Sequence, residues 1–159
     1  MKYLFITVLL LTAATAFAQQ SAVELLRQDL KTGKVALMTA SLPLTEKEAE
    51  LFWPIYREYS NELSKLGDRR VSVLKRYAQT YNNVTEMAAG EMMKESFSIQ
   101  RDRIELLEKY YDRVVKEVGG LTAARFAQIE NQVLTVIDAK LIDEIPLVKV
   151  PAASGGEKK

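Results

Sequence analysis

Two long stretches of helical periodicity, joined by a short polar turn, constrain the fold of this chain more than any other feature. In the first, which starts at Thr45, apolar residues recur every three or four positions as far as Tyr77. The second starts near Thr85, and its expected packing seam alternates steps of three and four, a repeat of about 3.5 residues that suits side-by-side helices. The members of this seam are Phe97, Gln100, Ile104, Leu107, Tyr111, Val114 and Val118. Each stretch covers about 33–36 residues, or about 50 Å of helix. The sequence therefore predicts a long antiparallel hairpin that turns at Asn82 and Asn83.

Two further helices flank the predicted hairpin. One covers residues 21–40, and the other starts at Thr122 and closes at Pro146. Proline and glycine are rare along this part of the chain and no stretch alternates as a strand does, so the fold class is all-α with four helices. A chain this short exposes much of so long a hairpin or pairs it with a second copy, which favours an elongated homodimer. The competing fold is a compact monomeric four-helix bundle, with the first long helix broken at Pro54 or Gly67.

A Leu-Thr step opens both the hairpin and the last helix. Thr45 is placed to cap the free backbone N–H groups of its helix, and Glu48, three residues on, completes the pattern of a capping box. Leu44 is expected to pack on the first turn as a hydrophobic staple. Leu121 and Thr122 are expected to act as staple and cap at the start of the last helix.

The N-terminal residues indicate where the protein works. A positive start at Lys2 precedes an apolar run and then small residues that end in Ala-Phe-Ala, which is the order of a cleavable secretory signal peptide. The apolar run is too short to cross a bilayer, so no membrane span is expected after cleavage. We therefore expect a signal peptide over residues 1–18, a single helical domain over residues 19–150, a disordered tail over residues 151–159, and a periplasmic location.

The composition of the chain limits the kinds of functional site that it can form. The chain of 159 residues contains neither cysteine nor histidine, which removes thiolate and imidazole groups as nucleophiles and metal ligands. The sequence also lacks an acidic loop with EF-hand spacing and a glycine-rich phosphate loop. Lys plus Arg number 22 and Asp plus Glu 21, and removal of Lys2 leaves 21 of each, so no basic surplus points to nucleic acid. We expect no catalytic, cofactor or metal site.

Aromatic residues near the start of the hairpin form the best candidate for a partner or client surface. The cluster consists of Phe52, Trp53, Tyr56 and Tyr59. Phe52 and Trp53 are adjacent and point about 100° apart on a helix, so one of them is expected to be exposed. The alternative is that both are buried, Phe52 by the first helix and Trp53 by the last. Met92 is a further candidate, because methionine offers an adaptable apolar surface. The alternatives for Met92 are a copper(I) contact and a filler of the core near the hairpin turn.

Polar residues interrupt two of the apolar rows, one in each helix of the hairpin. Arg70 and Gln100 lie within one turn of each other if position i of the hairpin faces roughly position 167 minus i, which suggests a hydrogen bond that fixes the register. The alternative is that Arg70 extends to water. Glu130 and Asn131, with Arg125, form a polar group on the last helix, for which a solvated face or an edge of a dimer is expected.

The two Leu-Thr steps carry a resemblance to a known family. They read Leu-Thr-Glu-Lys-Glu over residues 44–48 and Leu-Thr-Ala-Ala-Arg over residues 121–125, each before a helix. With the export signal, the four helices and the short charged chain, the protein resembles the Spy/CpxP family of periplasmic stress proteins, whose repeated motif is Leu-Thr-x-x-Gln. The resemblance implies an ATP-independent chaperone for unfolded or envelope proteins, or an envelope-stress sensor. The alternative is a dedicated regulator that binds a membrane sensor domain or an anti-sigma partner.

A second likeness covers most of the chain after residue 18. Small uncharacterised exported bacterial proteins carry a Phe-Trp-Pro-x-Tyr-x-x-Tyr segment, found here over residues 52–59. They also carry an Ala-Arg-Phe-x-Gln-Ile-Glu-Asn segment and an Ile-Pro-Leu-Val ending, found over residues 124–131 and 145–148. This likeness implies the same kind of exported helical protein and names no activity.

Overall fold

The computed structural model describes residues 31–149. The chain divides after Pro43 into two compact units. In the first unit, residues 31–41 are helical. The beginning of the helix expected over residues 21–40, the signal peptide and the C-terminal tail lie outside the described residues. Within the described range the secondary structure is helical and contains no strand, which agrees with the predicted all-α class.

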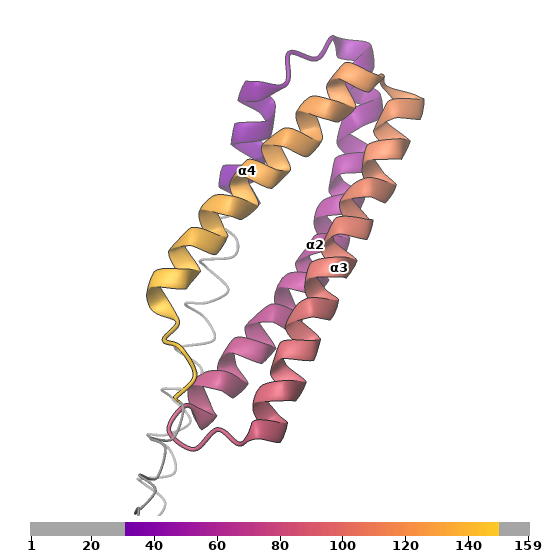
Figure 1. Cartoon of the computed structure of the whole chain (residues 1–159). Coiled ribbons are helices and arrows are strands. Elements are labelled where there is room, and N and C mark those ends of the chain that lie inside the picture. The colour runs from indigo at the N-terminus through magenta and orange to yellow at the C-terminus, as the bar shows by residue number, and fades with distance from the viewer. Residues whose placement is uncertain (1–30, 150–159) are drawn as a thin grey trace, which may run out of the picture. The chain divides into compact units, whose positions relative to one another are not determined.

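The second unit holds the hairpin and the last helix. Its elements are α2 (Glu46–Thr80), α3 (Glu86–Glu117) and α4 (Gly120–Glu144). Figure 1 shows α2 and α3 running side by side in opposite directions, with α4 returning along the hairpin. The predicted antiparallel hairpin is therefore present.

The beginning of α2 shows why the helix starts where it does. The Thr45 side chain accepts a hydrogen bond from the backbone N–H of Glu48, and the Glu48 carboxylate accepts one from the backbone N–H of Thr45 at 2.8 Å. Leu44, just before this capping box, is half-buried. From there α2 continues without a break through Pro54 and Gly67 for 35 residues, so the break that the compact four-helix alternative required does not occur. The buried apolar side chains on either side of the proline hold the helix together where one N–H is missing.

The start of α4 differs from the prediction. The helix begins at Gly120, and the residue that precedes it, Gly119, has φ +144°, a conformation that favours glycine. This tight turn starts the helix two residues early, and the backbone N–H of Ala123 already donates to the carbonyl oxygen of Gly119 at 3.0 Å. Thr122 therefore lies inside the first turn and does not cap the helix, and Leu121 is 91% exposed and staples nothing.

Polar side chains along one edge of the hairpin fix the register of α2 against α3. Arg69 donates to the Glu95 carboxylate at 2.9 Å and to the Ser98 hydroxyl at 3.2 Å, and it also binds Asp102. Further polar contacts join the same two helices: Glu62 binds Lys109 and Tyr110, and Glu58 binds Arg113. Partly exposed ion pairs contribute only about 0–1 kcal/mol each, so these contacts specify register more than they stabilise the fold.

Near the turn between α2 and α3, apolar packing closes the hairpin. Val73 from α2 and Met92 and Ile99 from α3 form a buried cluster. Tyr77, Val84 and Ala88 pack against it and are themselves partly buried. This cluster holds the two helices together up to the turn, and the last turns of α2 are positioned by it.

Candidate binding surfaces

The aromatic residues singled out in the sequence meet in the core of the second unit. Phe52 and Tyr56 from α2 pack against Phe126 from α4, with ring centroids 5.9 and 6.2 Å apart. Tyr59 lies 5.2 Å from the same ring and 5.5 Å from Tyr110 of α3. Edge-to-face pairs of this kind contribute about 0.5–1.5 kcal/mol each beyond the burial of their area. The cluster therefore joins all three helices.

Most of the predicted partner surface is buried. Phe52 is 0% exposed, Tyr56 2% and Met92 7%, so none of the three presents a free surface in this conformation. Phe52 is buried as the alternative expected, but the ring it meets is Phe126 of the last helix. Tyr56 packs against the same ring, and Met92 is a filler of the core near the turn. Trp53 is half-buried, with its ring 5.3 Å from that of Phe52. Of these four residues, Trp53 alone retains appreciable exposure.

The aromatic cluster encloses a carboxylate that the sequence analysis placed on the surface. Glu130 is 0% exposed and accepts hydrogen bonds from the hydroxyls of Tyr59 at 3.0 Å and Tyr56 at 3.3 Å. Burial, and then the negative charge of Glu130, raises the pKa of both tyrosines well above the usual value. With no exposed surface, this carboxylate is placed to hold helices together rather than to meet a substrate.

The solvated face expected for the polar group of α4 is wrong for Glu130, while Asn131 and Arg125 are exposed as expected. The signal that identifies Glu130 as buried is its position. It stands four residues after Phe126 and three before Val133, which places it on the apolar row of α4 itself.

A second polar contact ties α4 to the hairpin. Arg70 donates to one oxygen of Asp138 at 2.6 Å, and Arg103 lies 3.4 Å from the other. Gln100 is exposed, so the expected hydrogen bond between Arg70 and Gln100 is wrong. The reason is that α4 brings a carboxylate to Arg70, and a guanidinium binds an oppositely charged carboxylate more strongly than a neutral amide.

The apolar row of α3 that was predicted to form the packing seam is exposed along its first half. Phe97 is 49% exposed and Ile104 64% exposed, and Gln100 between them is also exposed. The neighbouring row of α3 is buried in its place, with Met92, Ile99, Leu106, Tyr110 and Val114 as its members. The expectation that Phe97 and Ile104 line the packing seam is therefore wrong, and α3 carries a second apolar row on its outside.

We call this second row the outer stripe; its members are Met93, Phe97, Ile104, Leu107 and Tyr111. Met93 is 49% exposed, and Leu107 and Tyr111 are half-buried. The stripe keeps a repeat of about 3.5 residues and extends for about 27 Å along α3. Exposed charges of both signs border it, namely Lys94, Arg101, Glu105 and Glu108. Apolar side chains gathered on an exposed face, with a polar rim, mark surfaces that contact other proteins.

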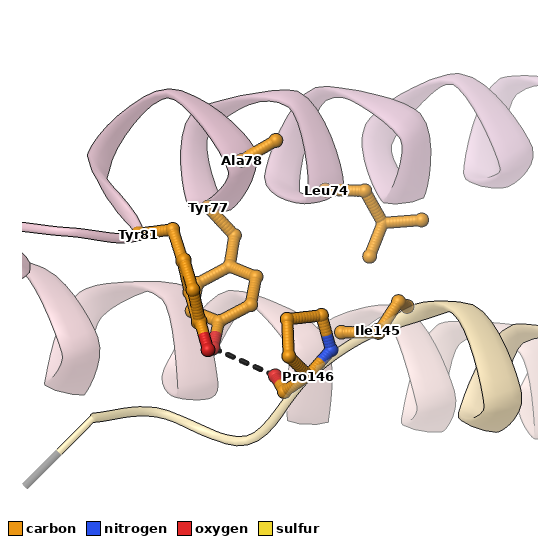
Figure 2. A pocket seen from close by; sticks show the side chains of 6 residues that line it. All are labelled: Leu74, Tyr77, Ala78, Tyr81, Ile145 and Pro146. Atoms are coloured by element: carbon orange, nitrogen blue, oxygen red, sulfur yellow. Dashed lines mark hydrogen bonds between the residues drawn. The ribbon is translucent and has the colours of Figure 1, made fainter.

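A groove lies at the end of the hairpin, where the chain leaves α4. One wall comes from the last turns of α2, and the other from Ile145 and Pro146. Figure 2 shows the proline beside the rings of Tyr77 and Tyr81, with the Tyr77 hydroxyl donating to the Pro146 carbonyl oxygen at 2.8 Å. The cavity between the walls has a volume of about 390 Å³.

Other kinds of site are not formed by the residues that the structure describes. Among residues 31–149, no group of three or more acidic side chains is arranged to hold a metal ion. In the same range, no helix is both long and apolar enough to cross a bilayer.

No protein-family model matches the chain, and no curated protein or solved structure is significantly similar to it.

Proposed function

We propose that the protein is an exported helical binding protein that holds apolar segments of unfolded or envelope proteins on the outer stripe of α3, without a covalent step. The observation that carries this proposal is the exposure of Phe97 and Ile104 in an ordered apolar row. Export is supported by the signal-peptide pattern of residues 1–18. The resemblance to periplasmic stress chaperones supports the same function, and the absence of cysteine and histidine from the sequence supports a protein that binds without chemistry.

The stripe is suited to contacts that form and release. Full burial of one large apolar side chain contributes about 1.5–3 kcal/mol, and about half of that is still available at Phe97 and Ile104. Together the two residues contribute roughly 1.5–3 kcal/mol, which corresponds to about 10–150-fold in affinity before ordering costs. The bordering charges of both signs keep the surface hydrated and favour no single charged partner.

The homodimer expected from the sequence is part of the proposal, because the same repeat suits the pairing of two α3 helices. Such a pair competes with client segments for the outer stripe. Sedimentation velocity of the wild-type protein and of the double variant Phe97→Ser/Ile104→Ser separates the two uses. If the wild type is a dimer and the double variant is a monomer, the dimer is held through the outer stripe. If the two proteins have the same oligomeric state, the outer stripe is free for clients.

Suppression of aggregation tests the function. Two unrelated globular proteins are denatured, diluted into buffer with the full-length protein, and followed by light scattering. We expect suppression of both clients at near-stoichiometric ratios, and roughly tenfold or more protein should be needed for the Phe97→Ser/Ile104→Ser variant. Circular dichroism confirms that this variant keeps its helices, since both side chains are exposed.

The matched control changes two other exposed apolar residues. Leu121 and Val136, which are 91% and 56% exposed, lie on α4 and outside the stripe. Leu121→Ser/Val136→Ser should suppress aggregation as the wild type does. Inertness of the wild type toward every client contradicts the proposal and favours the alternative, a regulator dedicated to one membrane sensor or anti-sigma partner.

A further inference from the structure

The groove at the end of the hairpin is built to accept an extended apolar chain. Its helical wall consists of Leu74, Tyr77, Ala78 and Tyr81, which follow one face of α2 with helical spacing. These side chains offer aliphatic and aromatic surface, and the Tyr77 hydroxyl is placed to bind a main-chain carbonyl oxygen. The space of about 390 Å³ lies between this wall and Ile145 and Pro146, so part of the wall is left uncovered beside the residues that follow α4.

The chain itself shows what such a ligand looks like. Residues 145–149, which we call the arm, follow α4 without regular secondary structure, and Ile145 has the extended backbone angles φ −107° and ψ 108°. Pro146 lies beside the two tyrosines and gives its carbonyl oxygen to Tyr77 (Figure 2). Aromatic-lined grooves bind proline-containing extended segments in this manner, because proline fixes the backbone before binding and lacks an N–H that would need a partner.

The arm is held by few contacts. Beyond Pro146, Leu147 is 90% exposed and Val148 44% exposed, so neither side chain anchors the arm by burial. The end of the arm is attached by Lys149, whose Nζ donates to the Asn82 side-chain oxygen at 2.7 Å and lies 4.5 Å from the centroid of the Tyr81 ring. A segment attached in this way can be exchanged for another of the same chemistry.

We propose that this groove is a second binding site, that it takes an extended, proline-containing aliphatic segment of another polypeptide, and that the arm is its resident, displaceable ligand. This inference rests on one part of the proposed function, namely that the protein binds other polypeptides. The groove lies on α2 and the outer stripe on α3, so each site can fail its test while the other stands.

Fluorescence anisotropy with full-length protein tests the groove. The probe is a fluorescein-labelled peptide, Ile-Pro-Leu-Val-Lys, which copies the arm. In Lys149→Ala the resident arm loses both contacts of its end, whereas the incoming peptide brings its own lysine. The peptide should therefore bind about fivefold more tightly to Lys149→Ala than to the wild type, because more of the protein has an open groove.

Two alanine-to-arginine variants locate the site. Ala78→Arg places a bulky charged side chain on the groove wall, and it should abolish peptide binding in the Lys149→Ala background. Ala139→Arg, at an exposed alanine of α4, should leave binding unchanged. A peptide in which alanine replaces the proline should bind several-fold more weakly.

Four results overturn the inference. Absence of binding to Lys149→Ala, or equal binding to the Ala78→Arg variant, eliminates the site. Equal affinity of the wild type and Lys149→Ala eliminates the role of the arm as a resident ligand. A wild-type dimer in sedimentation that Ala78→Arg dissociates assigns the groove to the arm of a second copy, not to a foreign segment.

Discussion

The hydrogen bond between Tyr59 and the buried Glu130 should stabilise the fold measurably. Tyr59→Phe removes one hydroxyl and keeps the ring in its edge-to-face contacts with Phe126 and Tyr110. A hydrogen bond to a carboxylate contributes about 1.5–3 kcal/mol, and Glu130 has no exposed surface through which water replaces the lost donor. We expect the free energy of unfolding to fall by about 1.5–3 kcal/mol and the melting temperature to fall by roughly 5–15 °C.

The matched control is the other tyrosine–glutamate contact of the hairpin. Tyr110 donates to Glu62 at 2.8 Å, but the Glu62 side chain is 41% exposed and also binds Lys109. Tyr110→Phe should therefore lower the stability by less than half as much as Tyr59→Phe. Urea unfolding followed by circular dichroism measures both variants. Equal losses, or a loss below about 0.5 kcal/mol for Tyr59→Phe, would refute the reasoning that burial strengthens this bond.

Three further predictions concern pH and glycine. The pKa values of Tyr56 and Tyr59 are raised in the folded state, so the free energy of unfolding is at its full value below about pH 10 and falls as the pH rises further. The urea midpoint should therefore be lower at pH 11 than at pH 8. Equal midpoints contradict the raised pKa values of the two tyrosines. Gly119→Ala should destabilise by about 1–3 kcal/mol because φ is +144°, whereas Gly120→Ala, measured in the same thermal melts, should be neutral or stabilising. Gly67→Ala should stabilise α2 by about 0.5–1 kcal/mol, since an added Cβ meets no atom within 4 Å; a lower melting temperature would show a hidden contact.

The hairpin was predictable because its information is local and periodic. Apolar spacing defines α2 and α3, and threonine caps mark where both helices start. The predicted pairing placed Arg69 opposite residue 98, and Ser98 is among its hydrogen-bond partners. A register within one turn therefore follows from the position of the turn alone.

The face that α3 turns inward was not predictable from its own sequence. Two adjacent apolar rows, one through Ile99 and Leu106 and the other through Phe97 and Ile104, both have helical spacing. The choice between them depends on where α2 and α4 supply matching surface, which the pattern of one helix does not contain.

The burial of Glu130 was not predicted, for a related reason. Glu130 occupies an apolar row, but its burial depends on two hydroxyls that lie 71 and 74 positions away in the sequence. A carboxylate is normally read as exposed because its isolated burial is costly, and only the folded arrangement shows the donors that offset this cost. The partner residues Phe52 and Tyr56 were misplaced with it, since the same cluster encloses them.

Photo-crosslinking tests the binding surface most directly. Benzoylphenylalanine is introduced at position 97 on the outer stripe or at position 121, which is exposed on α4, and each protein is irradiated with a freshly diluted, denatured client. We expect crosslinks to the client from position 97 and a much weaker yield from position 121. Equal yields from the two positions, or crosslinks from position 121 alone, would contradict the assignment of client binding to the outer stripe.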